Sequence, residues 1–312
     1  MNAKMYIKIF PTFFLIILFL FGLTACSEND KSNDGQSKSK QAYYKNLNIT
    51  ILIDLSDRIS IKKNPTQVDR DIKFIMNVLD AFKTFLSRKG VVQSEDKIKV
   101  IYYPSINYEI YQDIADSLNI DFSNYEFMQR KKLFENISSI YYKNLKKLYS
   151  LASNAKSFEG SDLFNYFKHR VVDDCISNDS NFINLLIVLT DGYIYHKNSK
   201  YQDGNRFSYL LPEAPQVTYF RNINNWETVF DKNDFGLIKL HNDLSQLNIL
   251  CAEFSPIDHS PKDFDILKKY WTKWLIEQNI NKDNLKILRT DLNTLNRDVI
   301  FAFFNKILSR DL

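Results

Sequence analysis

Hard oxygen ligands follow the first apolar segment of the chain, in the stretch ILIDLSDRIS at residues 51–60. Asp54, Ser56 and Asp57 come directly after three aliphatic residues. A short apolar run of this kind predicts a buried strand, so these side chains are expected where the strand leaves the core. Such a group of oxygens can bind a metal ion, activate a nucleophile or cap a turn.

Two later segments supply oxygens in the same way. Ser161 and Asp162 lie in the turn FEGSDLF, which precedes a predicted helix, and Asp191 follows the apolar run LLIVLT. In an open α/β sheet, ligands gather at the carboxyl ends of the strands, near the switch point in strand order. Hydroxyls, carboxylates and water are the ligands that suit magnesium. The sequence therefore predicts an oxygen-rich site at this edge of a sheet.

The elements that must position these residues alternate between short apolar runs and longer segments with helical spacing. Strands are predicted within 49–56, 97–104, 182–192, 247–256 and 285–291, and helices over 69–89, 133–152, from the FEGSDLF turn to about 175, from 261, after a Ser260 cap, to about 275, and over 295–308. The segment 105–130 is ambiguous and is expected to hold a short edge hairpin. Apolar strands alternating with amphipathic helices predict an α/β domain with a doubly wound, mostly parallel sheet flanked by helices, of Rossmann-type topology.

Length and composition indicate a folded body without an obvious anionic partner. The chain has 312 residues, of which 45% are hydrophobic, enough to bury a sizeable core. Its formal charge of +4 becomes +2 when Lys4 and Lys8 are removed with the leader described next. Nothing in this balance calls for nucleic acid as a partner. Cys175 and Cys251 lie in apolar segments and are expected to be buried free thiols.

The first 25 residues are typical of a secretory leader. Lys4 and Lys8 precede an apolar run over 9–23, which is shorter than the roughly 20 residues that a membrane-spanning helix needs. The ending LTAC resembles the lipobox of bacterial lipoproteins, which implies that Cys26 is acylated, with palmitate-type chains, and becomes the first mature residue. More than one acyl chain gives stable membrane anchoring. A plain transmembrane anchor is the alternative.

Residues 26–46 are polar and are predicted to form a flexible tether between the lipidated Cys26 and the folded body. Ser27 differs from the aspartate of the inner-membrane retention signal, which favours the outer membrane. Glu28 and Asp30 resemble the surface-export signal of Bacteroidota lipoproteins. The predicted location is therefore the outer membrane of the cell envelope, and both a periplasmic and a surface-exposed domain remain open.

The oxygen ligands, taken in order, resemble the metal-ion-dependent adhesion site of the von Willebrand factor A (VWA) family, over roughly residue 48 to the C-terminus. Asp54 and Ser56 match the first two members of its Asp-x-Ser-x-Ser loop, Ser161 stands where the family usually has threonine, and Asp191 matches the acid of its Thr-Asp-Gly turn. The resemblance implies a VWA-like domain over 47–312. It also implies that these four residues bind Mg²⁺ or Mn²⁺, and that the ion engages a carboxylate of a protein or peptide partner.

The loop departs from the family at its last position, where Arg58 replaces the second serine. A guanidinium next to a divalent cation is repulsive, so Arg58 either points away or takes the place of the metal's charge. In the second case it can itself hold a ligand carboxylate through two hydrogen bonds. A metal site, a metal-free binding site and a purely structural turn therefore all remain open.

A long insertion, over about 193–236, follows Asp191 and is expected on the same rim. It is rich in the aromatic and arginine residues that interfaces favour: Tyr193, Tyr195, Arg206, Phe207, Tyr209, Tyr219, Phe220, Arg221 and Trp226. It is either part of a binding surface or a local decoration with its own small core. Candidate ligand contacts are Arg58, Asp162, Tyr193 and His196.

The leading hypothesis is a lipid-anchored binding module without enzyme activity. The alternatives are a metal-free scaffold in an envelope assembly and a phosphohydrolase of the haloacid dehalogenase type that uses Asp54. That chemistry needs a second acid two residues after the nucleophile, where this chain has Ser56, and further acids near Asp191. The sequence also has no nucleophile elbow, glycine-rich phosphate loop or Cys/His metal cluster.

Overall fold

The computed structural model describes residues 44–60, 65–103, 109–154, 160–257, 260–289 and 293–309. Residues 42–312 form one compact unit. The predicted leader, the lipidation site Cys26 and the tether up to residue 43 lie outside the described residues. Within the described part of the chain, no helix combines the length and apolar character needed to cross a bilayer.

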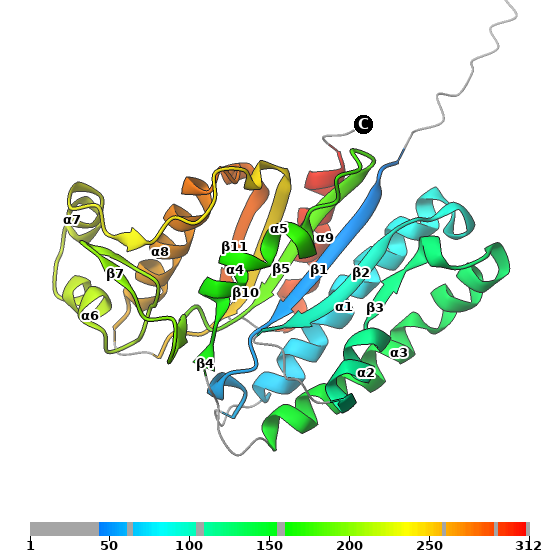
Figure 1. The fold of residues 1–312 in the computed structure, drawn as a ribbon, viewed down its shortest axis with the longest axis horizontal. Coiled ribbons are helices and arrows are strands. Elements are labelled where there is room, and N and C mark those ends of the chain that lie inside the picture. The colour runs from blue at the N-terminus through cyan, green and yellow to red at the C-terminus, as the bar shows by residue number, and fades with distance from the viewer. Residues whose placement is uncertain are drawn as a thin grey trace, which may run out of the picture. The chain divides into compact units, whose positions relative to one another are not determined.

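A six-stranded sheet in the order β11-β10-β5-β1-β2-β3 forms the centre of the unit (Figure 1). Neighbouring strands are parallel except for β3, which runs antiparallel to β2 at one edge. The fold is therefore α/β and doubly wound with a mostly parallel sheet, which confirms the predicted fold class. The strands are β1 (Asn46–Ile53), β2 (Lys97–Tyr102), β3 (Asn119–Asp121), β5 (Phe182–Leu189), β10 (Leu247–Phe254) and β11 (Leu285–Arg289).

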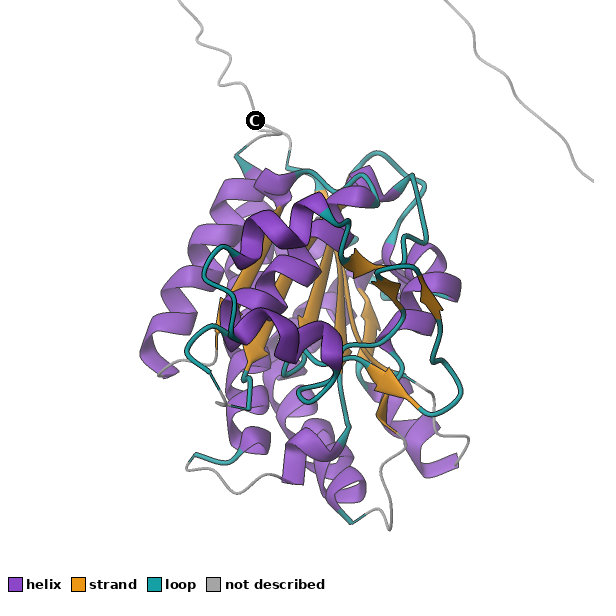
Figure 2. Cartoon of the chain, turned by 90° about the vertical axis from the view of Figure 1, so that its left-hand side faces the viewer, coloured by secondary structure: helices purple, strands orange, loops and turns teal. Residues whose placement is uncertain are grey.

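Helices cover both faces of this sheet (Figure 2). One face packs against α1 (Gln67–Lys89), α2 (Glu109–Ser117), α3 (Phe127–Ser153) and α9 (Asn293–Leu308), and the other against α4 (Leu163–His169), α5 (Val171–Cys175) and α8 (Asp263–Glu277). Short 3-10 turns are η1 (Asp57–Ser60), η2 (Val91–Gln93), η3 (Phe122–Asn124), η4 (Leu244–Gln246) and η5 (Lys282–Asn284).

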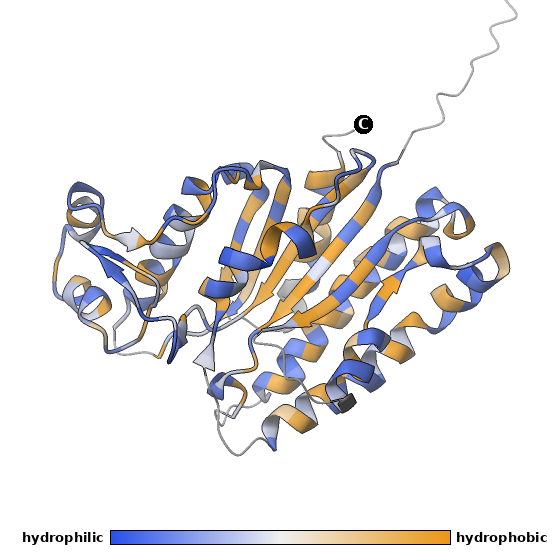
Figure 3. Ribbon diagram, viewed as in Figure 1, coloured by the Kyte–Doolittle hydropathy of each residue, from blue (hydrophilic) through white to orange (hydrophobic). Residues whose placement is uncertain are grey.

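Alternate side chains of β1 point to the two faces of the sheet, and each face is buried by a layer of helices. Its odd-numbered aliphatic residues, such as Ile51 and Ile53, pack under α1 and α3, whereas Leu52 belongs to the core of the other face. Asn48 and Thr50, also on that second face, donate hydrogen bonds to the carbonyls of Cys175 and Asp174 at 3.1 Å each. These two polar side chains of β1 therefore have hydrogen-bond partners, and the other side chains of the central strands are predominantly apolar and buried (Figure 3).

The ends of α1 agree with the predicted helix to within two residues. The Thr66 hydroxyl accepts a hydrogen bond from the amide of Asp69 at 3.1 Å, which caps the helix at its start. Gly90 ends it with φ +97°, a conformation that other residues rarely adopt.

The predicted free thiols are also confirmed, because Cys175 and Cys251 are buried and form no disulfide.

The segment between β2 and α3 differs from its prediction. Strand β3 does pair with β2 at the sheet edge, but α2 intervenes between them, so the expected hairpin is wrong. Helix α3 begins at Phe127 and not near residue 133. A capping box starts it, with the Glu126 amide donating to the Gln129 side chain at 3.0 Å. Sequence periodicity misses this first turn because its apolar residues are exposed.

The insertion after Asp191 has its own secondary structure. It contains β6 (Tyr195–His196), which pairs with β4 (Gly160–Ser161), and a small sheet of β7 (Gln202–Asp203), β8 (Arg206–Phe207) and β9 (Gly236–Leu237). Two helices, α6 (Pro215–Arg221) and α7 (Trp226–Lys232), complete it. Phe220 and Phe230 pack on Tyr270 of α8, with ring centroids 6.5 and 4.7 Å away. The insertion is therefore built onto the main core.

Candidate functional site

The oxygen-rich residues lie where β1 and β5 end side by side, at the centre of the sheet. The strand order reverses between these two strands, since β2 follows on one side of β1 and β10 on the far side of β5. Asp54 follows β1, and its amide donates to the carbonyl of Leu189, the last residue of β5, at 2.9 Å. Loops at such a switch point form the usual ligand site of doubly wound sheets.

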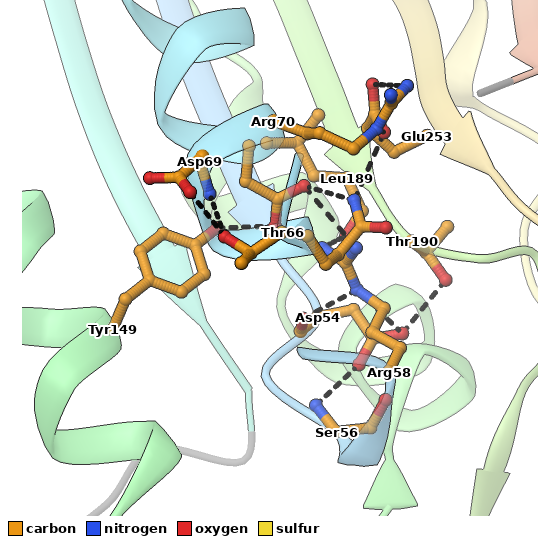
Figure 4. A network of polar contacts seen from close by, with 12 residues as sticks. Asp54, Ser56, Arg58, Thr66, Asp69, Arg70, Tyr149, Leu189, Thr190 and Glu253 are labelled. Atoms are coloured by element: carbon orange, nitrogen blue, oxygen red, sulfur yellow. Dashed lines mark hydrogen bonds and ion pairs between the residues drawn. The ribbon is translucent and has the colours of Figure 1, made fainter. Parts of the chain in front are cut away.

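The Asp54 carboxylate is buried and held by residues from both strands (Figure 4). Its Oδ1 accepts from the amide of Ser56 at 2.9 Å, and its Oδ2 accepts from the hydroxyl of Thr190, also at 2.9 Å. Thr190 was not among the predicted site residues, although it stands directly before Asp191. Asp54 and Ser56 are thus placed together at the end of β1.

Arg58 turns inward, away from the surface, and is almost fully buried. Its Nη2 donates to Asp71 Oδ2 on α1 at 2.6 Å and to the carbonyl of Leu189 at 3.1 Å, while its Nε donates to the carbonyl of Asp54 at 2.8 Å. Burial alone would lower the pKa of Arg58, but the charges of Asp71 and Asp54 raise it above its usual value. The guanidinium is buried and hydrogen-bonded inside the protein, so it is not exposed to bind a ligand carboxylate.

A buried polar network around Asp71 connects Arg58 with Tyr149 and Glu253, three residues labelled in Figure 4. Tyr149 of α3 donates to Asp71 Oδ2 at 2.6 Å, and Gln67 donates to Asp71 Oδ1 at 2.9 Å and to Glu253 Oε2 at 3.1 Å. Arg70 Nε also donates to Glu253 Oε2, at 2.9 Å. Burial first, and then the charge of Asp71, raise the pKa of Tyr149. The network ties α1, α3 and β10 to the end of β1.

Asp191 supplies a second carboxylate next to Asp54. Its Oδ1 accepts from the amide of Tyr193 at 2.9 Å, which fixes the turn after β5. Burial, and then repulsion from the Asp54 charge, raise the pKa of Asp191 to about 7; the hydrogen bond from Tyr193 and the charge of Arg58 only partly oppose this. Asp191 therefore holds its proton more tightly than an exposed aspartate does.

Ser161 is brought to the same rim by the pairing of β4 with β6 (Figure 1). Ser161 lies opposite Tyr195, four residues after Asp191, and its buried hydroxyl has no hydrogen-bond partner. The close approach depends on Gly160, whose φ is +94° and whose missing Cβ would lie 2.2 Å from the carbonyl oxygen of Tyr195.

Asp162 and His196 form a neighbouring polar cluster. Asp162 Oδ2 accepts from Asn165 at 3.0 Å and from the Ser199 hydroxyl at 3.2 Å, and it lies 3.4 Å from Nδ1 of His196. Its Oδ1 is buried without a partner. The structure thus places Asp162 and His196 together, bonded to Ser199 and Asn165, which the sequence analysis did not identify.

The aromatic residues of the insertion divide between core and surface. Tyr193, Phe207, Phe220 and Trp226 are buried, so they are not available as binding contacts in this structure. Their burial favours the second of the two predicted roles, an insertion with its own small core. Arg206 is bound to Asp234 and Glu277, and Arg221 to Asp263. Tyr195, Tyr201 and Tyr219 remain exposed.

The donor set fits a hard divalent cation. Two carboxylates that repel each other and a buried hydroxyl without a partner are the groups that such an ion satisfies. Among the described residues, no group of three or more His, Cys, Asp or Glu side chains is arranged to hold a metal. The predicted metal ligands are two aspartates and two serines. A search for three His, Cys, Asp or Glu side chains therefore does not test this set.

A scan against protein-family models and a search of curated proteins both found no match. Among solved structures, proximal thread matrix protein 1 from the mussel byssus aligns with a TM-score of 0.38 and 10% identity, over 84% of this chain and 48% of its own. The pilus adhesin SpaC from Lactobacillus rhamnosus GG, in its open conformation, aligns with a TM-score of 0.41 and 12% identity, over 85% and 30%. Another structure of SpaC gives 0.42 and 12%, over 86% and 31%. The chain therefore spans less than half of these proteins, and similarities of this size support no functional assignment.

Proposed function

We propose that the chain is a lipid-anchored binding module of the cell envelope with a VWA-like site. In this proposal, Asp54, Ser56, Ser161 and Asp191 hold Mg²⁺ or Mn²⁺, directly or through water. When bound, the ion supplies a positive charge that a carboxylate of a protein or peptide partner can approach. The role proposed for the site is binding and not catalysis.

The placement of Asp54 after β1 and Asp191 after the neighbouring β5, with the unpartnered Ser161 hydroxyl on the same rim, is the observation that carries the proposal. Burial, and then the nearby Asp54 charge, also raise the pKa of Asp191 to about 7. Arg58 makes its closest ion pair with Asp71, at 2.6 Å, and lies farther from Asp54, at 3.8 Å, so it only partly offsets the repulsion between Asp54 and Asp191. A divalent cation would relieve this repulsion, and the unpartnered hydroxyl of Ser161 would gain a partner.

A metal-free scaffold is the second candidate, and one distance favours it. Arg58 Nε lies 3.8 Å from Asp54 Oδ2, so the guanidinium supplies part of the charge that a metal would supply. The Ser56 amide and the Thr190 hydroxyl already bind both Asp54 oxygens. Under this alternative, a partner contacts the rim directly and no ion is required.

The anchor remains a proposal from the sequence. The lipobox-like LTAC ending and the polar residues 27–41 support acylation of Cys26 and a tethered domain at the outer membrane, either periplasmic or surface-exposed. Metabolic labelling with palmitate tests it: wild-type protein should carry the label, and Cys26→Ser should lose it.

Thermal unfolding of residues 42–312 during titration with Mg²⁺ or Mn²⁺ tests the metal site. At a concentration 100 times Kd, a ligand stabilises the folded state by about 2.7 kcal/mol, which corresponds to a rise in Tm of roughly 5–10 °C for a domain of this size. Asp54→Ala should abolish the response. Ser161→Ala should weaken it without changing the Tm of the metal-free protein, because its hydroxyl bonds to nothing that would be lost.

Asp203→Ala is the matched control, because Asp203 is an exposed acid on β7, outside the site. Its response should equal that of wild type. An unchanged wild-type melting curve up to millimolar metal would reject the metal site and leave the metal-free scaffold. Equal responses in wild type and Asp54→Ala would show that any binding occurs elsewhere.

A further inference from the structure

The start of α3 exposes two large apolar side chains to solvent. Phe127 is 65% exposed and Met128 is 71% exposed, more than any other large hydrophobic residue in the described part of the chain. Tyr125, just before the helix, is 36% exposed. Adjacent apolar residues held outside the core usually mark a surface that meets a partner or a membrane.

Basic side chains lie next to Phe127 and Met128, and these residues at the start of α3 are together called the tip. Lys131 and Lys132, one turn further along α3, are exposed and belong to none of the ion pairs among the described residues. Two acids lie close by in the sequence: Glu126, whose side chain is engaged in the capping box of the helix, and Glu135, which is exposed one turn after the two lysines. Arg130, Lys131 and Lys132 outnumber them, so the first turns of α3 combine exposed apolar side chains with a small excess of basic ones.

The tip lies at the end of the unit where the chain enters β1, opposite the candidate site. Arg130 Nη1 donates to the carbonyl of Val92 at 2.8 Å, which joins the first turns of α3 to η2. The same η2 turn leads to Glu95, which exchanges two hydrogen bonds with Asn46, the first residue of β1, at 3.3 Å each. Asp54 follows the other end of β1.

The far end of α3 lies beside the candidate site. Tyr149, near its last turn, bonds to Asp71 within the network under Asp54. Helix α3 has 27 residues, and an α-helix rises about 1.5 Å per residue, so its two ends are roughly 40 Å apart. Figure 1 shows the helix running from the amino ends of the parallel strands to their carboxyl ends.

We infer that Phe127, Met128, Lys131 and Lys132 form a membrane-docking tip that binds the surface of an anionic lipid bilayer. The two apolar side chains enter the boundary between headgroups and acyl chains, and the lysines contact the lipid phosphates. A lipid surface is favoured over a protein partner because the exposed apolar side chains are few, are bordered by cationic side chains, and lie at the end of the unit where the chain enters.

Only the biological use of this tip rests on the proposed lipid anchor. A flexible tether of about 20 residues spans roughly 25 Å on average, so it would leave the domain free to turn over the membrane. Docking of the tip would hold the end of β1 that carries Asp54 away from the bilayer. A second contact of this kind also adds to the retention that acyl chains give.

Co-sedimentation with vesicles tests the tip in the absence of any anchor or metal. Residues 42–312 are mixed, with a chelator present, with vesicles of phosphatidylcholine containing 30% phosphatidylglycerol. Wild type should bind, and binding should fall as salt is added. Phe127→Ser/Met128→Ser and Lys131→Glu/Lys132→Glu should each reduce the partition coefficient about tenfold or more, with an unchanged Tm.

Two matched controls separate this tip from general surface effects. Tyr201→Ser/Tyr219→Ser removes two exposed aromatic residues of the insertion, and Lys282→Glu/Lys286→Glu makes the same charge change on the far edge of the sheet. Both should bind vesicles as wild type does. Equal binding by the tip variants and these controls would overturn the inference.

Two other results would also overturn it. One is the absence of wild-type binding to the anionic vesicles. The other is self-association that depends on Phe127 and Met128, measured by sedimentation without vesicles, since this would make the tip a contact between copies of the chain. Neither result affects the metal titration, so the tip and the proposed function can fail separately.

Discussion

Replacing Arg58 with methionine tests whether its pair with Asp71 holds the loop after β1 in place. Methionine keeps much of the side-chain volume and removes the charge. The Asp71 carboxylate, which is fully buried, would then keep its hydrogen bonds from Tyr149 and Gln67 but lose its cation. Asp54 would also lose the Arg58 bond to its carbonyl.

The expected loss of unfolding free energy is about 3–5 kcal/mol, the usual cost of removing one partner from a buried ion pair. For a domain of this size, that loss lowers Tm by roughly 6–20 °C. Arg58→Met/Asp71→Asn should be more stable than Arg58→Met alone by about 1 kcal/mol or more, because no charge is then left unpaired.

Urea unfolding of residues 42–312, followed by tryptophan fluorescence, measures these differences. Arg170→Met is a matched control, since Arg170 pairs with Asp174 at 2.9 Å but lies on the surface. Its loss should cost less than about 1 kcal/mol. The reasoning is refuted if Arg58→Met costs no more than this control, or if the double variant is no more stable than Arg58→Met.

The remaining predictions concern pH and the close contact at Gly160. Because the pKa of Asp191 is raised from 3.8 to about 7 on folding, the folded state binds its proton more tightly. Stability without metal should therefore fall as pH rises from about 4 to 7 and then level off, and Asp191→Asn should lack this slope in Tm measured against pH. Gly160→Ala places a Cβ 2.2 Å from the Tyr195 carbonyl and should cost about 1–3 kcal/mol in urea unfolding. Gly90→Ala, with similar φ and open space, should cost less; equal costs would contradict the contact argument.

The sheet and its order of elements could be predicted because burial leaves a strong pattern in the sequence. The run from Phe182 to Leu189 is apolar except for Asn184, and the structure buries it on both faces in a parallel sheet. The same logic predicted that Asp54 and Asp191 would lie at the carboxyl ends of neighbouring central strands. Ile53 of β1 and Leu189 of β5 are paired, so the two acids follow adjacent strand ends.

The orientation of Arg58 could not be predicted, because it depends on a partner 13 residues away and on the packing of α1 over the sheet. One feature of the sequence nevertheless indicated that a buried cation was needed near α1. Asp71 stands four residues before Ile75, on the buried stripe of the helix, and an acid on such a stripe needs a cation.

Composition alone could not decide between a binding surface and a local core for the aromatic residues of the insertion. Aromatic residues that could serve an interface serve equally well as core, and Phe220 and Trp226 pack together beneath α6 and α7. Which of the two roles a residue takes depends on whether a neighbouring helix offers an apolar face. Here, α8 offers one, through Tyr270 and Trp271.

The attachment of the insertion to α8 determines how a partner would meet this rim. Arg206 binds Asp234, between α7 and β9, and both carboxylate oxygens of Glu277 on α8, at 2.6 and 2.9 Å. Trp271 Nε1 donates to the carbonyl of Gly192 at 2.8 Å, which fixes the point where the insertion leaves the sheet. Because these bonds fix the insertion at both ends, it is preorganised. A partner that binds this rim would therefore lose little conformational entropy of the insertion, and binding would be close to rigid-body docking.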